Sequence, residues 1–118
     1  MKSIVIVEDD VDLQFIFKSV LRRAGFDVKI LSDGRSLPDY SMLPDLFIFD
    51  IELPFITGLS LCKKVKVDPA TRHIPVMIAS ASAELLVQAN EACADEVLEK
   101  PFDPKVLVAK VRSLLGDQ

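Results

Sequence analysis

The chain has 118 residues, of which 50% are hydrophobic, and a formal net charge of −4. This length suits a single domain, spanning 1–118, that buries a core without disulfide or metal staples. A surface that binds nucleic acid needs clustered lysine and arginine to neutralise phosphates, whereas charges of both signs mix along this chain. The composition therefore argues against direct contact with nucleic acid.

The N-terminus and the cysteines indicate where the protein resides. Met1 to Val7 runs straight into carboxylates and is too short for a signal peptide. No apolar run approaches the roughly 18 residues of a membrane span. Cys62 and Cys93 lack C-x-x-C spacing, so we expect reduced thiols that serve packing. We expect a soluble cytoplasmic protein that does not insert into membranes.

Apolar runs alternate with helical patterns along the chain. Short apolar runs predict strands over 4–7, 26–31, 46–49, 74–79 and 96–98. Helical spacing and capping residues predict one helix that begins after Asp10 or Asp12 and ends at Gly25, and others over 58–67, 83–92 and 104–115. Two prolines leave room for at most a short helix over 35–44. This alternation predicts an α/β fold: a doubly wound parallel sheet of five strands with helices on both faces, in the flavodoxin-like order 2-1-3-4-5.

Polar side chains end the strands expected near the centre of this sheet. The run over 46–49 is apolar without alternation, as in a strand covered on both faces. The residues at the strand ends are Glu8 and Asp9, Asp50, Ser80 and Lys100. Because strands one, three and four are neighbours in the expected order, the three acids and the hydroxyl converge at one edge of the sheet.

The chemistry of these residues points to phosphoryl transfer. Three neighbouring carboxylates raise one another's pKa unless a cation lies among them, and oxygen ligands suit Mg²⁺. Lys100 adds a movable positive charge that can pair with Asp50 or with an anion attached to it. Catalysis of phosphoryl transfer is mainly positioning and charge neutralisation. We therefore predict that Asp50 is a nucleophile that forms an aspartyl phosphate, with Mg²⁺, Lys100 and Ser80 each holding a phosphoryl oxygen.

Several separated motifs resemble the receiver domain of two-component response regulators. They are Glu8-Asp9, Asp50 followed by Pro54 and Gly58, Ser80-Ala81, and Lys100-Pro101-Phe102. The resemblance covers nearly the whole chain. It implies Mg²⁺-dependent transfer of a phosphoryl group to Asp50 from a histidine kinase or phosphotransfer protein, slow autodephosphorylation, and signalling to a downstream protein target by altered docking. Such a domain catalyses its own phosphorylation and dephosphorylation without turning over a separate substrate.

The resemblance also assigns roles to single residues. It makes Asp9 the direct metal ligand, Glu8 an outer, water-mediated ligand, and Glu52 a ligand through its backbone carbonyl. Glu52 and Ser82 lie where the family tunes the lifetime of the phosphoryl group. Phe15 lies off the apolar stripe of its helix: either neighbours partly cover it, or it contacts a partner helix, since kinases and phosphotransfer bundles dock beside the first helix of this family.

Without an output domain, the chain resembles receivers that act alone, although a piece of a longer regulator would look the same. A phosphorylation-dependent homodimer is also compatible with the resemblance.

The region after Ser80 departs from the family pattern. Ser80 and Val97 occupy the positions of the switch residues, but Val97 replaces the usual aromatic. Cys93 replaces a glycine that adopts positive φ at low cost. The short helix over 83–92 carries three consecutive apolar residues, which cannot all face the core. One interpretation is that the signal leaves through a nonstandard surface of this helix; the other is that valine merely fills space and the apolar residues lie in a partly covered groove.

Two other functions compete with the receiver. An aspartate-nucleophile phosphatase of the haloacid-dehalogenase type shares the acid-x-acid step of Asp50 and Glu52. That class, however, places its nucleophile after the first strand and carries a cap insertion. A binding module that keeps only the fold is the second alternative. Degenerate modules of this kind usually lose the acceptor or the lysine, and both are present here.

Overall fold

The computed structural model describes residues 1–116, which form one parallel sheet and helices on both of its faces. The strands are β1 (Ser3–Val7), β2 (Asp27–Leu31), β3 (Leu46–Asp50), β4 (Val76–Ser80) and β5 (Glu96–Glu99). The helices are α1 (Val11–Arg23), α2 (Gly58–Val67), α3 (Ala83–Ala92) and α4 (Pro104–Leu115). The strands are parallel in the order β2-β1-β3-β4-β5, which confirms the predicted fold.

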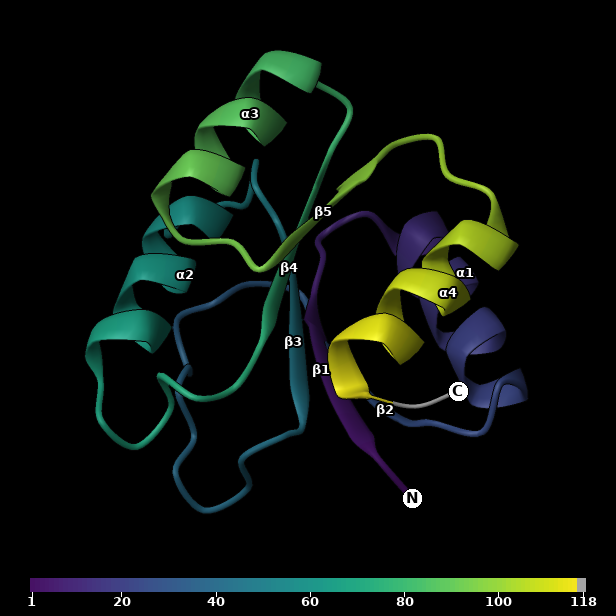
Figure 1. Cartoon of the computed structure of the whole chain (residues 1–118), viewed down its shortest axis with the longest axis horizontal. Helices are drawn as coiled ribbons and strands as arrows, with labels where there is room; N and C mark the ends of the chain where they lie inside the picture. The colour runs from purple at the N-terminus through teal and green to yellow at the C-terminus, as the bar shows by residue number, and fades with distance from the viewer. Residues whose placement is uncertain (117–118) are drawn as a thin grey trace.

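Two hydrophobic layers enclose the sheet. Figure 1 shows α2 and α3 on one side of the strands and α1 and α4 on the other. Alternate residues of β3 supply both layers: Phe47 and Phe49 pack towards α2 and α3, whereas Leu46 and Ile48 pack towards α1 and α4. This explains the continuous apolar run, because a strand covered on both faces needs apolar side chains at every position.

Two strands, β2 and β4, begin later than predicted. Residues 74 and 75 precede β4, since Pro75 has no N–H to donate and instead its carbonyl accepts from the N–H of Phe47 at 3.0 Å. The N–H of Val76, the first residue of β4, bonds the Asp95 carboxylate at 2.8 Å. Phe26 bonds back to the end of α1, so β2 begins at Asp27. Asp50 and Ser80 are the last residues of β3 and β4, in agreement with the strand ends expected from the sequence, and β5 extends to Glu99.

The segment between β2 and β3 contains no helix among its described residues. It is tied to α2 instead: Leu37 is buried, and its carbonyl accepts a hydrogen bond from the Lys64 ammonium at 3.0 Å. Tyr40 hydrogen-bonds Asp68 at the end of α2. The Arg35 guanidinium lies 3.7 Å from the centre of the Phe55 ring, in the loop after β3. These contacts hold the segment against α2 and against the loop that follows Asp50.

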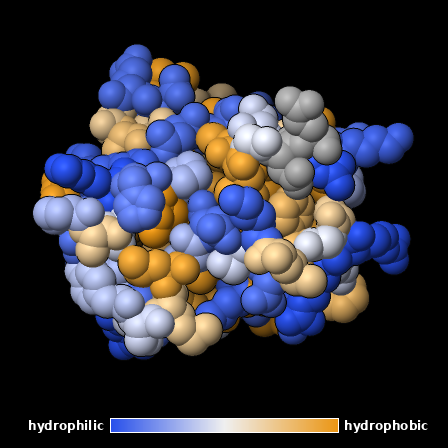
Figure 2. Space-filling model, turned by 60° about the horizontal axis from the view of Figure 1, so that its bottom comes forward, coloured by the Kyte–Doolittle hydropathy of each residue, from blue (hydrophilic) through white to orange (hydrophobic). Residues whose placement is uncertain are grey.

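Helix surfaces show where apolar spacing misled the prediction. Ile16, part of the predicted stripe of α1, is 40% exposed. On α3, Leu86 is buried and Val87 is exposed, as expected for consecutive apolar residues. On the face drawn in Figure 2, hydrophobic and hydrophilic groups alternate in small patches. Within 1–116, none of the helices has both the length and the apolar composition that a membrane crossing requires.

Both cysteines fit their positions as ordinary packing residues. Cys93 ends α3 with a φ of −161°, an extended backbone that any residue adopts, so this position does not require a glycine. Its N–H bonds the Ala89 carbonyl. Both cysteines are free thiols, Cys62 buried and Cys93 half-buried, as predicted.

Candidate functional site

The carboxyl ends of the strands bring the predicted acids together. The register pairs Val7 with Phe49 and Asp50 with Ala79, so β1, β3 and β4 end at the same level. Glu8 and Asp9 follow β1 directly, and Asp50 ends β3. Glu8, Asp9 and Asp50 each present one carboxylate oxygen, and these oxygens lie within 4.8 Å of one another.

Lys100 bridges two of these acids. Its ammonium donates to Glu8 Oε1 at 2.7 Å and to Asp50 Oδ1 at 2.8 Å. Glu8 is 1% exposed and Asp50 7% exposed. Charges so deeply buried are costly unless they are paired. The backbone N–H of Lys100 bonds the Ser80 carbonyl at 2.9 Å, which anchors the lysine to the end of β4.

Burial and ion pairing act in opposite directions on the titrating groups. Burial raises the pKa of the Glu8 carboxyl, and hydrogen bonds from Lys100 and the Asp10 N–H offset this only in part. Burial lowers the pKa of the Lys100 ammonium, but its bonds to Asp50 and Glu8 outweigh that effect and raise the pKa overall. The Lys100 ammonium therefore stays protonated between the two acids.

The donor set fits a hard divalent cation. Three carboxylate oxygens from separate residues gather on one side, and Asp9 is exposed, so the group opens to solvent. Mg²⁺ favours such oxygen ligands and retains several waters, which an open side accommodates. Lys100 neutralises part of the negative charge of this group.

The loop after Asp50 is folded tightly against the strand. Gly58 begins α2, and a Cβ at this position would lie 2.1 Å from the Asp50 carbonyl oxygen. Its N–H bonds the Ile51 carbonyl at 3.0 Å. Thr57 caps α2, since its hydroxyl accepts from the Ser60 N–H at 3.1 Å. Only glycine permits this close approach of the helix to Asp50.

Ser80 and Ser82 have different structural roles. Ser80 is buried at the end of β4, and its hydroxyl accepts from the Ser82 N–H at 3.0 Å. Ser82 is the N-cap of α3, where its hydroxyl accepts from the Leu85 N–H at 3.2 Å. The hydroxyl of Ser82 is thus engaged in starting the helix.

The remaining predicted site residues lie outside the acidic cluster. Glu52 is exposed in the loop after β3. Val97 lies half-buried in β5 and packs against the core on the α2 and α3 side. Phe15 is 71% exposed on α1.

The sequence analysis did not identify Arg35 and Phe55 beside the loop. Phe55 has a φ of 67° and is 72% exposed, with Arg35 over its ring. No short-range pattern links residues 20 positions apart, and positive φ at a phenylalanine runs against its intrinsic preference. This contact could be found only in three dimensions.

The position of Asp50 also bears on the phosphatase alternative. In that class the nucleophile follows the first strand, whereas Asp50 ends β3, in the middle of the sheet. The described chain does not have the arrangement that this alternative requires.

Comparisons with known proteins agree with this geometry. The family model for the response regulator receiver domain matches residues 4–112. The DNA-binding dual master transcriptional regulator RpaA from Synechocystis sp. is 33% identical over 98% of this chain and 49% of its own length. The chain spans about half the length of the curated relatives it matches.

Solved structures show the same fold. A candidate response regulator from Chloroflexus aurantiacus J-10-fl is similar with a TM-score of 0.91, at 34% identity and 98% coverage of both chains. The receiver domain of the sensor histidine kinase PA1611 from Pseudomonas aeruginosa PAO1 is similar with a TM-score of 0.88, at 23% identity and 98% coverage of both chains. That receiver has a magnesium ion coordinated in its active-site cleft.

Receiver domains of two-component systems accept phosphoryl groups, interact with histidine kinases and downstream effectors, and generally bind Mg²⁺ at an acidic site. The family match covers most of the chain, and the order of its strands agrees with it. This chain therefore belongs to the family of response regulator receiver domains.

Proposed function

We propose that Asp50 accepts a phosphoryl group from a phosphohistidine of a histidine kinase or phosphotransfer protein. The observation that carries this proposal is the buried Asp50 carboxylate, bonded to Lys100 at 2.8 Å and grouped with two further acids. A phosphoryl group attached there would meet a positive charge already in place. Preorganised charge of this kind is the main contribution a protein makes to phosphoryl transfer.

The reaction is a displacement at phosphorus. A carboxylate oxygen of Asp50 attacks the phosphorus atom while the bond to the donor imidazole nitrogen breaks, and the nitrogen keeps the electron pair. Asp50 becomes an acyl phosphate. In the dephosphorylation step, water attacks the same phosphorus atom, the bond to the Asp50 oxygen breaks, and inorganic phosphate leaves. The Asp50 carboxylate is thereby restored. The chain thus catalyses its own phosphorylation and dephosphorylation.

The other residues of the site position and neutralise the group. Lys100 moves from its carboxylate partners to a phosphoryl oxygen, which its flexible stem allows. Ser80, whose hydroxyl accepts a bond from Ser82, donates its own proton to another phosphoryl oxygen. Glu8, Asp9, Asp50 and the Glu52 carbonyl would hold Mg²⁺, Asp9 directly and Glu8 through water. When bound, the metal supplies positive charge to a phosphoryl oxygen.

Phosphorylation is read out as a change in protein docking. The surface between α3 and β5 is hollowed and is lined by residues that include Leu86, Val87 and Val97. Engagement of Ser80 by the phosphoryl group would pull on the start of α3 through Ser82. We propose that a downstream protein target, or a second phosphorylated copy, reads this surface. NMR signals of residues 83 to 98 that do not change on phosphorylation would contradict this output route.

Three further residues near the site have proposed roles. Phe15 contacts the phosphodonor protein, as its 71% exposure allows. Glu52 and Ser82 tune the lifetime of the acyl phosphate.

Residues 1–118 act as one receiver domain in the cytoplasm, without direct contact to nucleic acid. The DNA binding in the names of some relatives is a property of those longer proteins.

Intact mass spectrometry tests the acceptor. The chain is incubated with acetyl phosphate, with and without Mg²⁺, as wild type, Asp50→Ala and Asp27→Ala; Asp27 is an exposed aspartate of β2 and serves as the control. We expect one phosphoryl adduct that needs Mg²⁺, persists in Asp27→Ala and is absent in Asp50→Ala. An adduct that persists in Asp50→Ala would place the acceptor elsewhere.

A second measurement covers the case in which acetyl phosphate yields no adduct. Incubation with a phosphorylated phosphotransfer protein then separates a receiver that needs a docked donor from a module that keeps only the fold. Failure of both donors would overturn the proposed function in favour of the fold-only module.

A further inference from the structure

The two cysteines of the chain are distant in the sequence but adjacent in space. Cys62 lies in α2 and is buried, whereas Cys93 ends α3 and is half-buried. Figure 1 shows α2 and α3 on the same side of the sheet. Both cysteines pack in the same hydrophobic layer, and their thiols are close enough to form a hydrogen bond. We call Cys62 and Cys93 the thiol pair.

An ion pair beside the thiol pair joins the same two segments of the chain. Lys66 lies one helical turn after Cys62 on α2, and its ammonium bonds the Asp95 carboxylate at 2.7 Å. Asp95 closely follows Cys93 and also accepts a bond from the Val76 N–H at 2.8 Å. The segments that carry the two sulfur atoms are therefore held against each other by contacts that do not involve the thiols.

The two thiols differ in their access to solvent. Cys62 is 0% exposed, and burial together with its hydrogen bond to Cys93 raises the pKa of its thiol. Since the thiolate is the nucleophile, Cys62 is shielded from reagents in solution and is poorly ionised. Cys93 is half-buried, so a small molecule can reach its sulfur. Cys93 is therefore the entry point to the thiol pair, and Cys62 reacts only with a sulfur that is held next to it.

We propose that the thiol pair is a redox-active site, which a low-molecular-weight disulfide such as glutathione disulfide oxidises to an intramolecular disulfide. The Cys93 thiolate attacks one sulfur of the oxidant, the S–S bond of the oxidant breaks, and one glutathione leaves with the electron pair. Cys62 then loses its proton to water and attacks the Cys93 sulfur, which releases the second glutathione. Two protein thiols thereby lose two electrons, and one glutathione disulfide is reduced to two thiols.

The fold favours this disulfide because it brings the two thiols together in advance. In the unfolded chain the same bond must first join two distant residues, which costs conformational entropy. In the folded chain that freedom is already lost, so the effective concentration of one thiol at the other is higher. Disulfides in reducing compartments are typically transient and serve redox sensing or catalysis. The free thiols of this structure are then the reduced form of the site.

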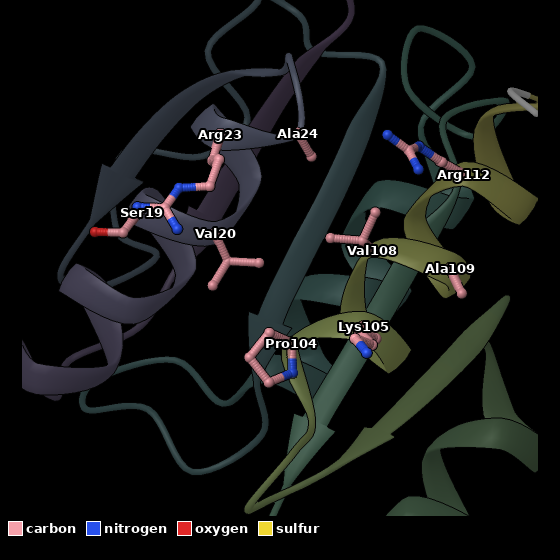
Figure 3. Close-up of a pocket in the computed structure, with 9 residues that line it drawn as sticks. All are labelled: Ser19, Val20, Arg23, Ala24, Pro104, Lys105, Val108, Ala109 and Arg112. Atoms are coloured by element: carbon pink, nitrogen blue, oxygen red, sulfur yellow. The ribbon is translucent and has the colours of Figure 1, made fainter.

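The thiol pair is separate from the phosphoryl chemistry. The Asp95 N–H bonds the carbonyl of Val76, so the turn after Cys93 lies at the amino end of β4, whereas the acidic cluster lies at the carboxyl ends of β1 and β3. The apolar hollow between α1 and α4, where Val20 and Val108 point towards each other, lies on the other side of the sheet and has no cysteine in its lining (Figure 3). The disulfide can therefore form, or fail to form, independently of the proposed function.

Equilibration with glutathione tests the site. The whole chain is incubated in mixtures of reduced and oxidised glutathione, the reaction is quenched with acid, and free thiols are alkylated after unfolding. Intact mass then gives the fraction of chains with a disulfide, and trypsin yields the joined peptides 36–63 and 73–105 where Cys62 is bonded to Cys93. We expect a disulfide that dithiothreitol reverses, with an effective concentration about tenfold or more higher in the folded chain than in the same chain unfolded in urea.

Single variants test the order of attack. Cys62→Ala keeps the accessible thiol and should accumulate a mixed disulfide between Cys93 and glutathione. Cys93→Ala should take up no glutathione while folded, because the remaining thiol is buried. Circular dichroism checks that each variant is folded, and the measurement on the wild type does not depend on either. Uptake of glutathione by folded Cys93→Ala would overturn the assignment of Cys93 as the entry point.

Four outcomes in the wild type would overturn the proposal. The first is the absence of an intramolecular disulfide under oxidising glutathione mixtures. The second is an effective concentration in the folded chain no higher than in urea, which would show that the fold does not favour the bond. The third is a disulfide that joins two chains instead of Cys62 and Cys93 of one chain. The fourth is a persistent glutathione adduct on Cys93, which would show that Cys62 does not attack it.

Discussion

Lys100 forms ion pairs with two of the three carboxylates of the acidic cluster. Its ammonium lies between two buried acids, and each of them would be left unpaired if the positive charge were removed. Burying an uncompensated charge costs far more than an exposed ion pair contributes. The residue thus stabilises the fold, and in the proposed function it would also pair with the phosphoryl group on Asp50.

The first prediction follows from that pairing. Lys100→Met should lower the free energy of unfolding in EDTA by about 3 kcal/mol, because Glu8 and Asp50 stay buried without their partner. Urea unfolding measures the change. Lys63→Met, an exposed lysine of α2, should alter stability little. A loss no larger than that of this control would show that the two acids do not depend on Lys100.

Gly58 allows the start of α2 to approach the backbone of Asp50 closely. A methyl group there would lie 2.1 Å from the Asp50 carbonyl oxygen, so either the loop or the strand end must move. Gly58→Ala should cost about 1–3 kcal/mol, the usual range for overpacking, and should slow phosphoryl uptake from acetyl phosphate. Urea unfolding and intact mass give the two readouts. Full uptake at the wild-type rate would show that the position of Asp50 does not depend on this contact.

At the scale of elements, side chains hold β5 against α4. The Lys110 ammonium of α4 bonds Glu96 of β5 at 3.1 Å and the Val97 carbonyl at 2.8 Å. Burial by itself would raise the pKa of the Glu96 carboxyl, but bonds from the Val97 N–H and from Lys110 outweigh burial and lower it below 4.5. The edge strand β5 is thus held by the ion pair with Lys110 as well as by its backbone pairing with β4.

A pH dependence follows from the lowered pKa of Glu96. A carboxyl whose pKa is lower in the folded chain stabilises the fold above its unfolded pKa, and that stability is lost as the pH falls through the folded pKa. Between about pH 6 and 3, wild type should therefore lose more stability than Glu96→Gln, by less than about 1 kcal/mol for a half-exposed pair. Thermal unfolding across that range checks this, with Glu91→Gln, an exposed position on α3, as the control. Identical pH profiles for wild type and Glu96→Gln would rule it out.

At the scale of the whole molecule, the acidic cluster joins β1 to β3 across the sheet. Glu8 and Asp9 come from one strand end and Asp50 from another. A ligand that binds only when these ends are aligned stabilises the folded state by mass action. The same alignment that forms the sheet therefore forms the acidic cluster.

Magnesium should accordingly stabilise the whole domain. At a Mg²⁺ concentration ten times its dissociation constant, the free energy of unfolding should rise by about 1.4 kcal/mol. Asp9→Asn should lose this increase, because it removes a carboxylate ligand. Asp10→Asn should keep it, since Asp10 caps α1 and asparagine caps equally well. Urea unfolding with and without Mg²⁺ measures each case, and an undiminished increase in Asp9→Asn would exclude Asp9 as a ligand.

By itself, the sequence determined the fold class, because the runs and periodicities that make strands and helices are local. The unbroken apolar run of β3, and the acids that follow β1 and β3, were readable without coordinates for the same reason. Once the strand order was assumed, the convergence of Glu8, Asp9 and Asp50 followed from the geometry of parallel sheets.

Only the tertiary structure decided the contacts between residues far apart in the chain. The bridge from Lys100 to Glu8 spans 92 positions and depends on the packing of β5 beside β4. The contact of Arg35 with Phe55 and the hydrogen bond from Lys64 to the Leu37 carbonyl likewise join distant segments. Local patterns carry no information about such distances, because they are set when the layers pack against the sheet.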